Sequence, residues 1–288
     1  MKLIDTHTHV NLRAFKDDAP ETIQRALDAG VAVVNVGTQI DTSREAVEML
    51  KKFPNDVYAV IGLHPTHTYH HDYEDDEEVK FKTREESFDA ELYQALLDDA
   101  GEDAKRIVGI GECGLDYYRM PEDRDAEEIK SLERDAFEKQ IHFALKNNKA
   151  LCIHCRPSEG TQDAYEDMLE IVKRVKMENP QLRFEVHCYT GNLELALEFA
   201  KLGGFIGLNG IITFDKTGRS EEVVKGLPLE FMILETDAPY LTPKLNRGKR
   251  NEPSYLPEVA EKIAEWKEVA VEEVAEVTTM NARELFNI

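Results

Sequence analysis

The sequence predicts an α/β protein with eight parallel strands, a (β/α)8 or TIM barrel, forming a single domain over residues 1–288. Short β-branched apolar runs alternate eight times with stretches of helical periodicity, the pattern of a parallel sheet with crossover helices. The chain has 288 residues, 42% of them hydrophobic, which suffices for one barrel of about 250 residues. A doubly wound open sheet is the alternative, but the Gly-rich first turn of its dinucleotide-binding version is missing.

The expected elements follow one another along the chain. The opening run MKLIDTHTHV predicts the first strand, and the helix expected over 17–29 ends at Gly30, a residue type that often terminates helices. The later strands are expected over 31–37, 57–64, 107–112, 150–154, 183–187, 204–210 and 231–237. The later helices are expected over 42–52, 87–100, 126–148, 161–177, 192–202, 220–225, 256–265 and 271–286. Between them, residues 67–86 lack clear periodicity and carry an acidic run, so we expect a solvated loop insert or a lid there.

Composition narrows the class of protein. No run of about 18 apolar residues is present, so no membrane span is expected. The first strand starts too early for a signal peptide to precede it, which favours the cytoplasm, and we expect a monomer or a weak oligomer. The net charge of -22 argues against binding nucleic acid with the whole surface, so a phosphate-bearing substrate must be attracted locally.

Four cysteines are too few for a disulfide framework. Cys152 and Cys155 are three residues apart on an expected strand, so they point to opposite faces and cannot bridge. Cys113, Cys155 and Cys188 each follow a candidate site residue and face away from it. We expect these three as reduced thiols in the layer between sheet and helices.

Candidate metal ligands gather where the expected strands end. His7 and His9 are two residues apart on a strand, so both imidazoles point to the same face. The carboxyl ends of all strands meet at one face of a (β/α)8 barrel, where active sites are found. Four imidazoles and two carboxylates exceed the four ligands of one tetrahedral site and suit two ions bridged by Glu112. The other strand ends contribute His64, Glu112, His154, His187 and Asp237.

Positive charges near the same face predict contacts with phosphate. Arg156 follows His154 by two residues and shares its side of the chain if the strand continues. The loop after the eighth strand holds the densest cationic cluster of this acidic chain, which we expect at the mouth of the site as a contact to a phosphate backbone. That basic segment contains Lys244, Arg247, Lys249 and Arg250.

Blocks of sequence around these residues resemble the TatD family of metal-dependent deoxyribonucleases. The blocks occur in order and span nearly the whole chain, so the resemblance is specific. They are DTHTH (5–9), GLHP (62–65), GIGECGLD (109–116), IHCR (153–156), HCYTG (187–191), and ETDAPYL (235–241) with RNEP (250–253).

The resemblance implies a TIM-barrel hydrolase with two divalent ions, Mg, Mn or Zn, acting on DNA or another nucleic acid as a 3′–5′ exonuclease or repair nuclease. It implies that His64 and Arg156 contact the scissile phosphate and that Asp237 orients the attacking water. It implies one ion held by His7, His9, Glu112 and Asp237, and another held by Glu112, His154 and His187.

Two rival functions share the same metal ligands. An amidohydrolase-like barrel would cleave amide or ester bonds, including the ester of an aminoacyl-tRNA. Many such enzymes bridge their ions with a carboxylated lysine on the fourth strand, where this chain has Glu112. A non-catalytic metal-binding protein is less expected, because structural sites are closed, whereas this one has surplus ligands at an open mouth.

Overall fold

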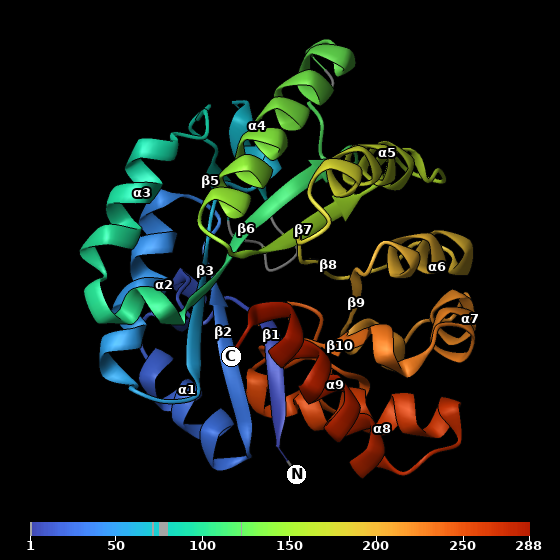
Figure 1. Cartoon of the computed structure of the whole chain (residues 1–288). Helices are drawn as coiled ribbons and strands as arrows, with labels where there is room; N and C mark the ends of the chain where they lie inside the picture. Colours follow the sequence, from blue (N-terminus) through green and yellow to red (C-terminus); the bar gives the residue numbers. More distant parts are fainter. Residues whose placement is uncertain (1, 71, 75–79, 122) are drawn as a thin grey trace.

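Eight parallel strands form a nearly closed barrel in the computed structural model, which confirms the predicted fold class (Figure 1). The structure describes residues 2–70, 72–74, 80–121 and 123–288. Loop hydrogen bonds join the last strand to the first: the Asp237 N–H donates to the His7 carbonyl over 2.9 Å, and the His9 N–H donates to the Ala238 carbonyl over 2.8 Å. In sheet order the strands are β1 (Leu3–Thr8), β2 (Val31–Val36), β3 (Val57–Ile61), β6 (Ile107–Asp116), β7 (Ala150–Arg156), β8 (Phe184–Val186), β9 (Phe205–Leu208) and β10 (Met232–Leu234).

Helices surround the strands in Figure 1 and cover the outside of the barrel. Several begin at a side chain that accepts hydrogen bonds from the first turn, such as Asp89, Asp125 and Asn192. None of the described helices is both long enough and apolar enough to cross a membrane. The helices are α1 (Ala19–Asp28), α2 (Ile40–Lys52), α3 (Ala90–Asp99), α4 (Ala126–Lys146), α5 (Asp163–Glu178), α6 (Leu193–Lys201), α7 (Arg219–Gly226), α8 (Leu256–Lys267) and α9 (Val271–Phe286).

Two apolar clusters hold the fold together. The larger fills the layer between the strands and the surrounding helices. The smaller fills the inside of the barrel, where Leu285 and Phe286 of α9 pack with strand residues such as Ile4 and Val108. The last helix thus closes the amino-terminal end of the barrel. The polar side chains at the opposite end rest on this apolar floor.

The structure changes several expected boundaries. β6 runs four residues beyond Glu112, which therefore lies within a strand and not at its end. β10 stops three residues before Asp237, which stands in the following turn with φ of 55°. The insert contains a hairpin, β4 (Asp72–Glu74) paired antiparallel with β5 (Lys80–Lys82), which the lack of clear periodicity in the sequence did not predict. The rest of the acidic run, 75–79, lies outside the described residues.

All four cysteines are free, as expected. Cys113 and Cys155 pack in the layer between sheet and helices, which agrees with the prediction. Cys188 does not, because the chain turns there with φ of 47° and its side chain lines the cavity described below. Cys152 faces the other way, into the barrel.

Candidate metal centre

The predicted ligands converge at the carboxyl-terminal end of the barrel. A cavity of about 1770 Å³ opens there. His7 lies beneath it, fully buried, with its Nε2 atom 3.2 Å from Nε2 of His9. Seven predicted site residues line the cavity: His9, His64, Glu112, His154, Arg156, His187 and Asp237.

Glu112 stands at the centre of this group and presents its two oxygens to two different sets of side chains. Its Oε2 atom is 3.5 Å from His7 Nε2 and 3.6 Å from His9 Nε2. Its Oε1 atom is 2.8 Å from His154 Nδ1 and 3.4 Å from His187 Nε2. The side chain is 5% exposed, so water contributes little to stabilising its charge. A carboxylate placed in this way is suited to bridge two ions.

The first set of atoms has the spacing of a tetrahedral site. Asp237 Oδ1 completes it, 3.9 Å from His7 Nε2 and 3.4 Å from His9 Nε2. Four ligand atoms about 2.1 Å from a tetrahedral ion lie about 3.4 Å from one another. Five separations between atoms of this set run from 3.2 to 3.9 Å. The donors therefore fit one divalent ion without rearrangement.

The second set has three donors, from Glu112, His154 and His187, whose ligand atoms lie within 4.8 Å of one another. Three protein ligands leave a fourth position of a tetrahedral ion open, the arrangement typical of catalytic sites. Nitrogen and oxygen donors together favour Zn, Mn, Co or Fe in affinity, whereas Mg prefers mostly oxygen.

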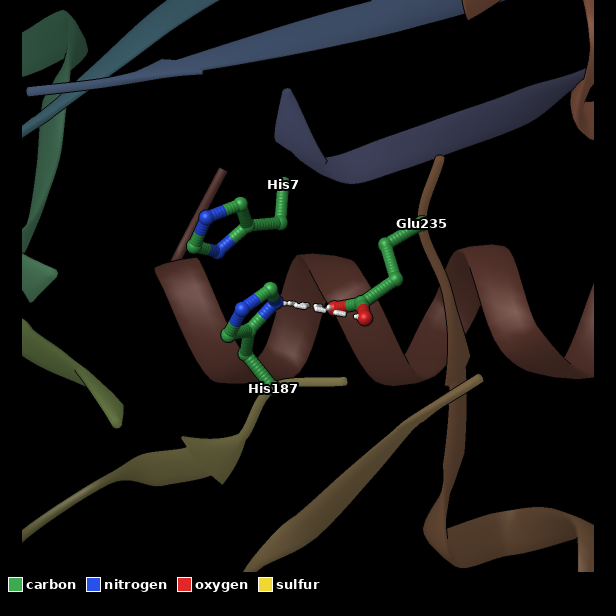
Figure 2. A group of neighbouring side chains, drawn as sticks. All are labelled: His7, His187 and Glu235. Carbon is green, nitrogen blue, oxygen red and sulfur yellow. Dashed lines mark hydrogen bonds and ion pairs between the residues drawn. The ribbon is translucent and has the colours of Figure 1, made fainter. Parts of the chain in front are cut away.

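Several histidine rings are oriented by a hydrogen bond at the ring nitrogen that does not face the proposed ions. His9 donates its Nδ1 proton to the Val36 carbonyl over 2.9 Å. Asp116 Oδ2 lies 3.1 Å from His154 Nε2. Figure 2 shows Glu235 reaching the His187 ring, whose Nδ1 atom is 3.2 Å from Oε1. Such partners hold a ring in one tautomer and one direction, which metal-binding histidines commonly require.

Asp116 and Glu235 were not assigned roles from the sequence. Each nevertheless lies an even number of residues from an assigned carboxylate, four after Glu112 and two before Asp237. Even spacing in extended chain puts side chains on the same face, and this signal could have found both. Their partners could not be deduced, because His154 and His187 are on other strands.

His64 differs from the other histidines in its tautomer. The Thr66 N–H donates to His64 Nδ1 over 3.2 Å, so that nitrogen is an acceptor and the neutral ring carries its proton on Nε2. That N–H faces the site, 3.5 Å from Glu112 Oε1. Burial lowers the pKa of His64 to about 4, which keeps the ring neutral near pH 7. His64 is therefore built to donate a hydrogen bond.

Both central carboxylates are stabilised in the ionised form. Burial alone would raise the pKa of Glu112, but His64 and His7 hold the pKa of this carboxyl well below its usual value. Burial also favours a raised pKa for Asp237, but its hydrogen bond with His9 and the nearby His187 and His7 rings together outweigh burial, so the pKa of Asp237 is lowered as well. The buried Glu112 carboxylate and the partly exposed Asp237 carboxylate, both ionised and surrounded by imidazoles, form an anionic pocket suited to cations.

Arg156 lines the cavity at the end of β7, with its guanidinium 4.2 Å above the Tyr118 ring. No ion pair joins it to a carboxylate among the described residues, so its charge is available to a substrate. The cavity has five further cationic side chains on its wall: Arg13, Lys16, Arg44, Lys52 and Arg119.

The basic segment is further from the cavity than expected. Asn251 donates to the Thr236 and Tyr240 carbonyls over 2.9 and 2.6 Å, which ties the end of the loop to its start, and Lys244, Arg247 and Lys249 between them are exposed. Arg250 is bound to Asp18 by two hydrogen bonds, of 2.6 and 2.8 Å. The cavity lining includes none of the four predicted cations, Lys244, Arg247, Lys249 and Arg250. Their contact with phosphate stays a prediction.

Comparisons with known proteins agree with this geometry. The family model described as TatD related DNase matches residues 4–287. The uncharacterized metal-dependent hydrolase YabD of Bacillus subtilis is 36% identical over 287 residues, covering 99% of each chain. The 3′-5′ ssDNA/RNA exonuclease TatD of Edwardsiella piscicida is 28% identical over 295 residues, covering 99% of this chain and 100% of its own. The crystal structure of the TatD homologue YJJV from Escherichia coli K12 superimposes with a TM-score of 0.80 at 26% identity, covering 99% and 98% of the two chains.

Proposed function

Because the chain belongs to the TatD related DNase family of metal-dependent hydrolases, we propose that it removes nucleotides from the 3′ end of DNA with two divalent ions. The observation that carries the proposal is the pair of Glu112 oxygens facing two separate donor sets. Two ions held there supply an activated water and neutralise charge on a phosphodiester. The first ion is assigned to His7, His9, Glu112 and Asp237, and the second to Glu112, His154 and His187.

The protein side chains perform the remaining steps. Asp237, ionised and 14% exposed at the cavity, accepts a proton from the attacking water and orients it. His64 donates a hydrogen bond from its Nε2–H group to a phosphate oxygen. Because the ring is neutral, it does so without repelling the nearby ions. Arg156 offers a forked cation to the same phosphate, with its plane held by the Tyr118 ring.

The size of the cavity supports a polymeric substrate. Sites for small molecules measure about 300–1,000 Å³, and this cavity of about 1770 Å³ extends from the donor atoms to residues of α1 and α2. A single strand fits such a groove better than a duplex end. The scissile phosphate must reach ligand atoms that are buried, and a paired second strand would have to enter with it. The relative named as a single-strand DNA and RNA exonuclease supports the same substrate class.

The test is hydrolysis of labelled oligonucleotides by protein that has been stripped with a chelator and reloaded with Mg²⁺, Mn²⁺ or Zn²⁺. A 5′-labelled single strand is expected to shorten progressively, while a 3′-labelled one releases labelled mononucleotide at once. If no metal gives nucleotide release and the loaded protein cleaves aminoacyl esters or amides instead, the nuclease proposal is refuted. Chelated protein is the control for contaminating nucleases that need no metal.

A further inference from the structure

Cys152 touches one of the assigned metal ligands from inside the barrel. Its Sγ atom lies 3.1 Å from His7 Nδ1, and both side chains are fully buried. Cys152 is on β7 and packs with the apolar cluster that fills the barrel. The Nε2 atom of His7 faces the cavity and the donor atoms of His9 and Glu112, and the sulfur lies on the opposite side of the ring.

Within the part of the chain that the structure describes, no oxygen is hydrogen-bonded to Nδ1 of His7, although neighbouring histidines have such a partner. His9 has the Val36 carbonyl and His187 has Glu235 at the corresponding nitrogen. Figure 2 shows that Glu235 reaches His187 and not His7, whose ring lies flat against the His187 ring at 3.6 Å. Among the described residues, sulfur is the partner recorded for His7 Nδ1.

A second buried group points to the same place. Glu185 on β8 is fully buried, and neither of its carboxyl oxygens has a hydrogen-bond partner among the described residues. Its carboxyl group, Cys152 Sγ and a His7 ring nitrogen lie within 4.8 Å of one another. A buried carboxyl without a partner is costly, so a donor nearby matters to it. The Cys152 thiol and the Thr6 hydroxyl are donors beside this carboxyl, and the Thr6 hydroxyl donates to the Leu234 carbonyl over 3.2 Å, which leaves the thiol hydrogen for Glu185.

We propose that Cys152 is a positioning residue for His7. Its sulfur accepts a hydrogen bond from the His7 Nδ1–H group, and its own thiol hydrogen points toward Glu185. A neutral imidazole carries one proton, so a proton held on Nδ1 leaves the Nε2 lone pair directed at the ion site. Sulfur is a weak acceptor, so His7 is held less firmly than His187, which faces a carboxylate. The Glu185 carboxyl, the Cys152 thiol and the His7 imidazole thus form a series of hydrogen-bonded groups that extends the site into the barrel. The inference rests on the proposed function only in taking His7 as a ligand.

Three variants test it: Cys152→Ala removes the acceptor, Cys152→Ser keeps one, and Cys113→Ala is the control. Cys113 is fully buried like Cys152, but the hydrogen-bond partners of its sulfur among the described residues are the Ile110 and Cys152 backbone carbonyls. Loss of a partner that orients a ligand weakens metal binding by about 10- to 100-fold. We expect Zn²⁺ affinity, measured by competition with a chromophoric chelator, to fall by that factor in Cys152→Ala. Cys152→Ser and Cys113→Ala are expected to remain within a few-fold of the wild type.

A second measurement needs no metal and no activity. Long-range ¹H–¹⁵N NMR spectra of the metal-free protein report which nitrogen of His7 is protonated. The Nδ1–H form is expected in the wild type, Cys152→Ser and Cys113→Ala, and a mixture of tautomers in Cys152→Ala. Wild-type Zn²⁺ affinity together with the Nδ1–H form in Cys152→Ala overturns the inference. If instead the wild type binds no Zn²⁺, the proposed metal centre itself fails, while the tautomer spectrum still tests the role of Cys152.

Discussion

Replacing Glu112 by glutamine tests the bridging role most directly. The amide keeps the size of the side chain but has only one acceptor oxygen, where the carboxylate has two. The other position becomes an NH₂ group that faces either His7 and His9 or His154 and His187. One donor set therefore loses its charged ligand and meets a hydrogen-bond donor instead.

The expected magnitude follows from burial. Glu112 is 5% exposed, so water cannot replace the missing charge. Breaking a buried ionic contact by removing one partner costs about 3–5 kcal/mol. That energy corresponds to about 10²- to 10⁴-fold weaker binding of one ion. Glu112→Gln is expected to hold one equivalent of metal where the wild type holds two, and to lose turnover by a similar factor.

The assay is equilibrium dialysis against micromolar Mn²⁺ followed by elemental analysis, with nucleotide release measured on the same samples. Glu133→Gln is the matched control, since Glu133 is another fully buried glutamate and contacts the Asp116 backbone N–H at 2.9 Å. The control is expected to keep both ions. Two equivalents of Mn²⁺ and wild-type turnover in Glu112→Gln would refute the bridge.

Three further outcomes are expected. Asp237→Asn keeps a ligand oxygen but cannot accept a proton, so kcat should fall about 10²- to 10⁴-fold while metal content changes little; an unchanged kcat contradicts the role of Asp237. Burial raises the pKa of Glu133 well above its ordinary value, so its neutral form is favoured in the folded state. Its contribution to stability is complete below pH 4.5 and is lost as the pH rises through the raised pKa, and the Tm of Glu133→Gln should therefore gain on that of the wild type with rising pH; parallel Tm curves contradict this assignment. Removing the cavity cations, or those of the basic segment, should reduce the slope of log K against log salt for single-stranded DNA by about 0.7 per lost phosphate contact; an unchanged slope contradicts a phosphate contact for the set that was removed. The two sets of alanine substitutions for this comparison are Arg13, Lys16 and Lys52, and Lys244, Arg247 and Lys249.

Local pattern and spacing determined the fold class. Alternation of β-branched runs with helical periodicity requires parallel strands joined by crossovers, and eight repeats of that unit close into a barrel. The spacing of His7 and His9 placed both rings on one face, and their Nε2 atoms are 3.2 Å apart in the structure. These inferences succeeded because side-chain direction along a strand depends only on residue number.

Tertiary structure decided which atoms meet. The sequence placed Glu112 at a strand end, but β6 continues to Asp116 and thereby delivers a second carboxylate to His154. The contact of Cys152 with His7 joins residues 145 positions apart, and no local pattern encodes it. The loop that carries the basic segment is closed by Asn251, which bonds back to the chain after β10. Periodicity reports which face a side chain occupies, whereas its partner depends on how separate strands are registered and where loops are pinned, which only the packed barrel determines.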